Sequence, residues 1–176
     1  MQILSSTSTN SRLEEFFVTM LQEMYWSEIH LVTVLSTMTG AASNDELIQA
    51  FDQHRQQTEE HVKIVERVFG VLGIPPQAEP SAGLQGLFDE GWQVIDETEE
   101  GSAQRDVALI IAAQKVEHYE IACYGSLVTL AATLGEIEVA DMLRAVLTEE
   151  KETDATLTII AESKINAQAS EEPVAH

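Results

Sequence analysis

The fold is decided by residues 110–134, IIAAQKVEHYEIACYGSLVTLAATL, a long apolar segment interrupted by acidic side chains. A stripe at alternating spacings of three and four runs through it, as in a helix that faces a partner helix. Its members are Ile110, Ala113, Glu117, Glu120, Tyr124, Leu127, Ala131 and Leu134. Glu117 and Glu120 stand mid-stripe, where a desolvated charge is costly unless it is paired. Something elsewhere in the chain must therefore satisfy these two carboxylates.

The composition of the 176-residue chain indicates a single globular, helical domain. Hydrophobic residues make up 44% of it, which excludes a disordered chain, and there are only 4 prolines to break helices. The formal net charge of −21 argues against nucleic acid and anionic lipid as partners. Such acidity attracts cations, although solubility is its more common purpose.

The sequence shows no sign of secretion or membrane insertion. A lone cysteine, Cys123, excludes a disulfide within the chain, and no apolar run of about 18 residues predicts a membrane span. Residues 1–11 are rich in serine and threonine but lack a basic segment, so we expect a frayed tail there and not a signal peptide. We therefore expect a cytoplasmic protein that has no membrane partner.

Four long helices are predicted, because apolar residues recur at helical spacing over about residues 11–38, 44–72, 105–135 and 137–165. Short loops join the first pair and the second pair. A much longer connection separates the pairs, and we expect a short helix over residues 84–95 within it. Two hairpins joined by one long crossover define an all-α, ferritin-like four-helix bundle. We expect this bundle over residues 12–166, between flexible tails at 1–11 and 167–176.

Each of the four predicted helices carries polar residues near the middle of its buried stripe. They are Glu28, His54, Thr58, His61, Glu117, Glu120, Glu150 and Asp154. Several carboxylates at one level of a bundle repel one another unless protons or cations neutralise them. Two metal ions per chain, iron or manganese, would do so with carboxylate and imidazole ligands. The expected ligands are Glu28, His54, Glu117, Glu120, Glu150 and Asp154, with a bridging role for Glu28 or Glu117.

Other interpretations of these residues stay open. The glutamates could share protons in a purely structural network with tyrosines or Lys115. A single buried histidine is more often hydrogen-bonded than metal-bound, and for His61 we favour that interpretation. Whether Thr58 or Tyr124 joins the site is not decided by the sequence. Four further acidic residues beside the stripes are expected to be solvated, namely Glu59, Glu60, Glu149 and Glu152.

The chain resembles the YciF/YciE group of ferritin-like stress-response proteins. The resemblance spans about residues 12–166 and rests on Glu28, Phe51 with His54 and Thr58, the run QKVEHYEIACYG from Gln114 to Gly125, and Glu149-Glu150-Lys151 with Asp154. The resemblance implies a ferritin-like bundle, a homodimer and a di-metal site, and it implies no particular reaction. The sequence lacks the Glu-x-x-His pair that ferritins carry on two helices. Its Glu117-x-x-Glu120 pair is similar to the two glutamates that serve the metal cluster from one helix of rubrerythrin.

Two functions are consistent with this pattern. The first is a di-iron or manganese protein that reacts with peroxide or oxygen, or sequesters metal. The second is a dimeric scaffold, without catalysis, whose polar core is empty or structural. The sequence does not decide between an enzyme and a scaffold. For the homodimer we expect contacts through apolar surfaces outside the inner stripes, such as Phe16, Val32 and Val34.

Overall fold

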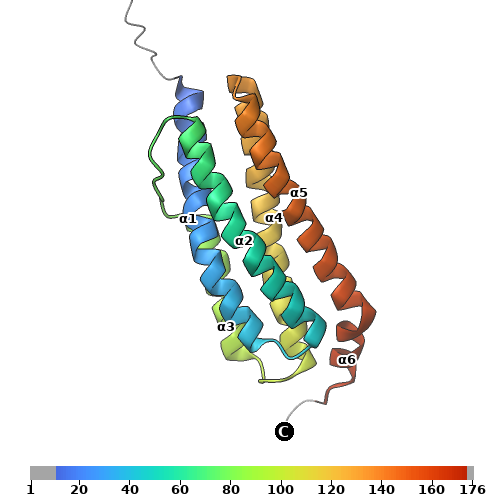
Figure 1. Cartoon of the computed structure of the whole chain (residues 1–176). Coiled ribbons are helices and arrows are strands. Elements are labelled where there is room, and N and C mark those ends of the chain that lie inside the picture. Colours follow the sequence, from blue (N-terminus) through green and yellow to red (C-terminus); the bar gives the residue numbers. More distant parts are fainter. Residues whose placement is uncertain (1–10, 174–176) are drawn as a thin grey trace, which may run out of the picture.

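The computed structural model describes residues 11–173, and they form a bundle of long helices (Figure 1). The elements are α1 (Arg12–Ala41), α2 (Asp45–Val71), α3 (Ala82–Glu97), α4 (Ala103–Leu134), α5 (Ile137–Ile160), a π-helical segment (Ala161–Ile165) and α6 (Asn166–Glu171). The four long helices are α1, α2, α4 and α5, as the apolar periodicity predicts. No strand occurs in this part of the chain, and none of its helices is long and apolar enough to cross a membrane.

Side-chain caps fix where the helices begin. Ser11 forms a capping box with Glu14, and the side chain of Asn44 accepts hydrogen bonds from the first turn of α2. Serines 81 and 102 cap α3 and α4 in the same way. Gly135 ends α4 at a φ of 85°, a left-handed conformation that favours glycine, so α5 can begin at once. These local signals produce the two hairpins, α1–α2 and α4–α5.

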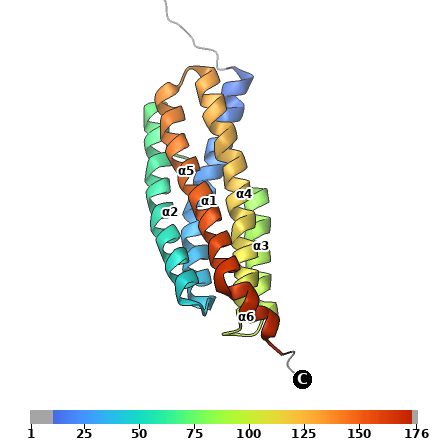
Figure 2. The same cartoon turned by 90° about the vertical axis from the view of Figure 1, so that its right-hand side faces the viewer.

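The crossover between the hairpins carries α3, which packs along the outside of α4 (Figure 2). Its first part is pinned to α1 by a hydrogen bond from Glu79 N to Gln22 O of 3.2 Å. Gly83 allows α3 to approach α4, because a Cβ atom there would lie 2.6 Å from the ring of Tyr119. The predicted helix in the crossover is thus confirmed, and it begins slightly earlier than residue 84.

The apolar core consists of two clusters with a polar layer between them. One cluster contains Phe17, Leu21 and Met24 of α1 and Tyr124 and Leu127 of α4, among others. The other contains the later part of α1 and the earlier part of α4, together with α3 and the end of α5. The residues between the clusters are the polar residues in the middle of the four stripes. The divided core therefore places the candidate site halfway along the bundle.

The ordered helix at the C-terminal end extends beyond the predicted boundary at residue 166. It continues through α6 to Glu171, so the tail expected from residue 167 is wrong for this segment. Glu172 accepts hydrogen bonds from the backbone amides of Ala103 and Gln104 at 2.6 and 2.9 Å, which ties the chain end to the start of α4. The expected tails at 1–10 and 174–176 lie outside the described residues.

Candidate metal centre

Six ionisable side chains from all four long helices meet at the polar layer. They are Glu28 of α1, His54 and His61 of α2, Glu117 and Glu120 of α4, and Glu150 of α5, and each is at most 2% exposed. The helical spacing predicts this convergence, because each residue belongs to the inward stripe of its own helix. Four carboxyl groups and two imidazoles therefore share one water-excluded space.

The first of two ligand groups consists of His54, Glu117, Glu120 and Glu150. Nε2 of His54 lies 3.0 Å from Oε1 of Glu117 and 4.0 Å from Oε2 of Glu150. One ligand atom from each of the four residues lies within 4.8 Å of the others. Such a set of three carboxylates and one imidazole can surround a single cation.

The second ligand group consists of Glu28, His61 and Glu150. Nδ1 of His61 lies 3.0 Å from Oε1 of Glu150 and 3.7 Å from Oε2 of Glu28. Glu150 is common to both groups and turns a different oxygen toward each histidine. Glu28 and Glu117, for which we expect a bridging role, each belong to one group only.

Eight nitrogen and oxygen atoms of this cluster are buried and make no hydrogen bond of good geometry, although Nε2 of His54 and Nδ1 of His61 each lie 3.0 Å from a glutamate oxygen. They are Oε2 of Glu28, Nε2 of His54, Nδ1 of His61, Oε2 of Glu117, and both carboxylate oxygens of Glu120 and of Glu150. A buried polar atom without a partner costs about 1–3 kcal/mol, so natural proteins contain few of them. A whole set of such atoms at one point is typical of a binding site.

The imidazoles of the cluster favour their protonated forms. Burial lowers the pKa of His54, but the charge of Glu117 and its contact with the ring outweigh burial and raise this pKa to about 9. Burial also lowers the pKa of His61, but the contacts with Glu150 and Glu28 raise it to about 11. Without cations, the cluster therefore binds protons at its two histidines.

The carboxyl groups also bind protons more tightly than usual. Burial, reinforced by the charges of Glu150, Glu28 and Glu117, raises the pKa of Glu120 well above its ordinary value. Burial raises the pKa of Glu150 to about 7, although its contact with His61 opposes the rise. All four shifts have the same direction, because the crowded carboxylates need positive charge in their midst.

Three neighbours hold those atoms of the cluster that point away from its centre. The buried hydroxyl of Tyr124 donates to Oε1 of Glu28, which leaves Oε2 free. Glu149 Oε2 lies 2.9 Å from Nε2 of His61 and leaves its Nδ1 facing Glu150 inside the cluster. The Oγ1 atom of Thr153 lies 3.4 Å from Nδ1 of His54 and leaves its Nε2 facing Glu117 inside the cluster.

Five of the six expected ligands meet in the cluster, and Asp154 does not. Its Oδ1 lies 3.1 Å from Nε2 of Gln114 and 3.5 Å from Nδ1 of His118, and its side chain is 23% exposed. Asp154 follows Glu150 by four residues, which rotates it about 40° around the helix. Its side chain is also shorter than that of glutamate, and the two effects leave it at the rim.

His61 occupies the place of a second histidine in the cluster. The expected hydrogen-bonded core role agrees with its burial and with its contact to Glu149, and its Nδ1 also faces Glu28 and Glu150. A spacing of seven residues from His54 puts both rings on one face of α2, and this signal was present in the sequence. Thr58 does not join the cluster, since its hydroxyl donates to the carbonyl of His54 at 2.9 Å.

A four-helix bundle with one long crossover and inward-facing glutamates and histidines at mid-length is a ferritin-like protein. The chain belongs to the family described as Domain of unknown function (DUF892), whose profile matches residues 12–170. The ferritin-like fold and the resemblance to the YciF group, both expected from the sequence, are confirmed.

Several relatives share nearly the full length of this chain. Protein YciF of Escherichia coli strain K12 is 39% identical over 158 residues, which cover 89% of this chain and 95% of that protein. The crystal structure of the E. coli stress protein YciF matches with a TM-score of 0.84 at 38% identity, covering 89% of this chain and 99% of that one.

YcfI of Rhodopseudomonas palustris, described provisionally as a structural protein, matches with a TM-score of 0.82 at 29% identity, covering 86% of this chain and 96% of that one. A protein of Xanthomonas campestris shares the fold, with a TM-score of 0.71 at 24% identity over 90% of this chain and 97% of that one.

Proposed function

We propose that the buried cluster binds two metal ions per chain, iron or manganese, one in each ligand group. The observation that carries this proposal is the set of eight buried polar atoms that make no hydrogen bond of good geometry, all of which belong to the two groups. The two close contacts of His54 and His61 leave most of the carboxylate oxygens, including both of Glu120, without a partner, whereas two divalent cations would satisfy them and offset the carboxylate charge. Glu150 would lie between the two ions, because it belongs to both groups.

The residues of the cluster fit such ions chemically. Carboxylate oxygens and imidazole nitrogens suit iron and manganese, and no soft sulfur ligand is present in either group. Three of the possible ligands also have a second partner on the side away from the cluster centre. Tyr124 contacts Glu28, Glu149 contacts His61, and Thr153 contacts His54. Second partners of this kind fix the tautomer and orientation of a ligand, and they are a regular feature of metal sites.

A bound pair of redox-active ions would supply the electrons to react with peroxide or oxygen. The protein itself contributes a space from which water is excluded, since apolar clusters close it at both ends. Sequestration of metal is the simpler use of the same site. Because E. coli YciF is named a stress protein, we place either role in a stress response.

A structural role for the cluster is the second candidate. The raised pKa values of His54 and His61 favour two imidazolium ions that pair with the carboxylates and replace the cations. The description of the R. palustris relative as a structural protein agrees with this alternative. In that case the polar layer would specify the packing of the bundle, and the protein would be a scaffold without catalysis.

Metal content and apo stability, measured on the same variants, separate the two candidates. We expect the protein purified without chelator to contain metal by mass spectrometry, and Glu150→Ala and Glu117→Ala to lose most of it. The matched control is Asp154→Ala, which removes a carboxylate outside both groups and should retain the metal.

The melting temperature of the metal-free protein is the second measurement. Removal of one crowded carboxylate should leave it unchanged or raise it, because repulsion is relieved. Unchanged metal content together with a loss of about 1–3 kcal/mol in the apo form would show a structural network and contradict the metal proposal.

A further inference from the structure

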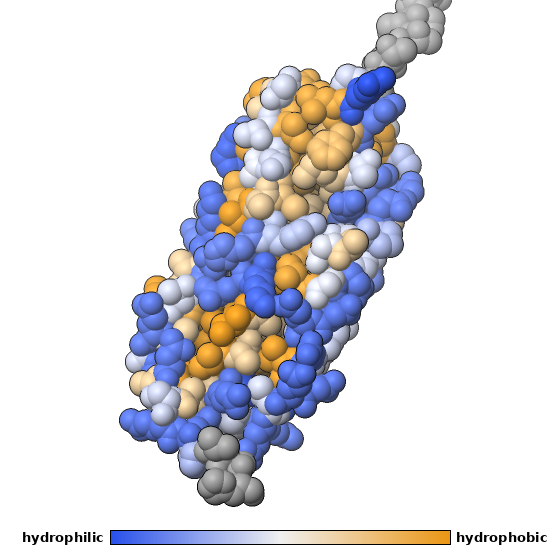
Figure 3. All heavy atoms as spheres, turned by 180° about the vertical axis from the view of Figure 1, so that it is seen from behind, coloured by the Kyte–Doolittle hydropathy of each residue, from blue (hydrophilic) through white to orange (hydrophobic). Residues whose placement is uncertain are grey.

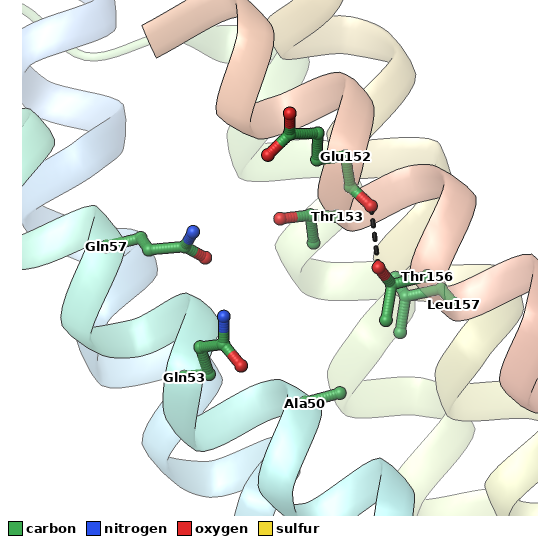
Figure 4. A pocket seen from close by; sticks show the side chains of 7 residues that line it. All are labelled: Ala50, Gln53, Gln57, Glu152, Thr153, Thr156 and Leu157. Carbon is green, nitrogen blue, oxygen red and sulfur yellow. Dashed lines mark hydrogen bonds between the residues drawn. The ribbon is translucent and has the colours of Figure 1, made fainter.

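A small polar pocket opens on the surface between α2 and α5, beside the candidate metal centre (Figure 4). Its volume is about 130 Å³, which is room for several water molecules. Gln53 and Gln57 of α2 face Glu152, Thr153 and Thr156 of α5 across it. Every one of these five side chains offers an oxygen atom, and none of the residues that line the pocket is basic.

Thr153 connects this pocket with the cluster. Thr153 lines the pocket, and its Oγ1 atom lies 3.4 Å from Nδ1 of the buried His54. Two larger hollows lie at the far end of the bundle, around Ser102 and Glu172, and no residue of the cluster lines them. Among these three hollows, the pocket between α2 and α5 is thus the one that leads toward the ligands.

We propose that this pocket is the access route by which a hydrated divalent cation reaches the buried centre, past Thr153 and the ring of His54. The proposal rests on the metal-binding function proposed above. Divalent iron and manganese keep oxygen ligands while they shed water, and the amide, hydroxyl and carboxylate oxygens of the pocket can replace that water stepwise. The carboxylate of Glu152 at the exposed edge attracts the cation from solution.

The test measures how fast the apo protein takes up Co²⁺, a spectroscopic substitute for the native ion. The full chain is stripped with chelator and mixed with Co²⁺ in a stopped-flow spectrometer, and the visible absorbance of the bound ion is followed. Thr156→Trp fills the pocket without changing a ligand. We expect it to slow uptake by about tenfold or more, while the final absorbance stays that of the wild type.

The matched control is Thr148→Trp. Thr148 and Thr156 are both exposed residues of α5 whose hydroxyls donate to the carbonyl four residues earlier, at 2.9 and 2.8 Å. Only Thr156 lines the pocket. Equal uptake rates for the two folded tryptophan variants, checked by circular dichroism, would overturn the access route.

A second pair of variants tests the route without filling it. Glu152→Lys places a positive charge at the pocket, whereas Glu138→Lys makes the same change at an exposed position of α5 far from it. We expect only Glu152→Lys to slow uptake, by about tenfold at low salt and less at high salt. Equal rates for this pair would also overturn the route.

The outcome for the wild type separates failure of the route from failure of the site. A wild-type protein that takes up no Co²⁺ at equilibrium would overturn the proposed metal function and the route with it. If the protein binds Co²⁺ fully at equilibrium and neither pocket substitution changes the uptake rate, the access route alone would be overturned.

Discussion

Oε2 of Glu149 lies 2.9 Å from Nε2 of His61, so a half-exposed carboxylate at the surface holds a fully buried imidazole. We expect Glu149→Ala to weaken binding of divalent metal about 10- to 100-fold, because the ring of His61 loses its orientation. Glu149→Gln keeps a hydrogen-bond acceptor and should lose less. Isothermal titration with Mn²⁺ measures both affinities. An affinity for Glu149→Ala equal to that of the exposed control Glu138→Ala would contradict this role.

The hydrogen bond from Tyr124 to Glu28 should stabilise the apo fold. We expect Tyr124→Phe to lower the free energy of unfolding by about 1–3 kcal/mol, since a buried carboxyl oxygen of Glu28 loses its donor. Tyr25→Phe is the matched control, because Tyr25 donates to Glu66 at 2.8 Å near the surface and should cost less. Chemical denaturation of both apo variants checks this difference, and equal losses would argue against it.

The apo protein should lose stability as the pH rises. The pKa of Glu150 is raised from 4.5 to about 7, so the folded chain holds this proton more tightly than the unfolded chain, and the advantage is lost between those values. The pKa of His54 is raised from 6.5 to about 9, so its contribution is complete below pH 6.5 and is lost as the pH passes 9. We therefore expect the apo melting temperature to fall from pH 5 to pH 9.

Bound metal should reverse this trend, because its ligands must be deprotonated. The gain in melting temperature on adding Mn²⁺ should thus grow with pH. Differential scanning calorimetry across the range measures both effects, and Glu150→Gln should flatten the apo curve below pH 7. An apo melting temperature that rises toward pH 9 would contradict the assigned shifts.

The homodimer remains a prediction, and the structure changes the surface on which it would rest. Val34 is only 7% exposed and belongs to the core of the chain itself, so it is not free for a partner, whereas Phe16 is 56% exposed. Figure 3 shows an apolar area at one end of the bundle. We expect Phe16→Glu to convert a dimer into a monomer in light scattering, and a wild-type monomer at micromolar concentration would exclude the dimer.

The sequence predicts the fold well because local signals agree with one another. The apolar stripes, the caps at Ser11 and Asn44 and the stop at Gly135 all specify the same four helices. The sequence does not predict the end of the last helix, where Glu172 contacts the start of α4. Such a contact joins residues about seventy positions apart, and no local pattern announces it.

The sequence predicts most of the residues that meet in the site, but it does not predict which of them lie next to one another. Helical periodicity places Glu28, Glu117 and Glu150 inside, but it does not say which residue is shared between the groups. Asp154 lies at the rim because of a small rotation around the helix, and the spacing of residues in a stripe does not distinguish positions that differ by so small an angle. The role of Glu149 was hidden, because a surface glutamate that reaches inward looks like any solvated neighbour.

A core divided by a polar layer need not unfold as one unit. Without cations, only bound protons and the two imidazoles join the crowded carboxyl groups of the layer, so each end of the bundle can open while the other stays packed. Amide hydrogens around Leu21 and around Leu35 would then exchange with solvent at separate rates. Cations bound in the layer would tie all four helices together at their midpoints. Metal binding would thus make the whole molecule unfold cooperatively, and the protection of amide hydrogens from exchange would rise at both ends together.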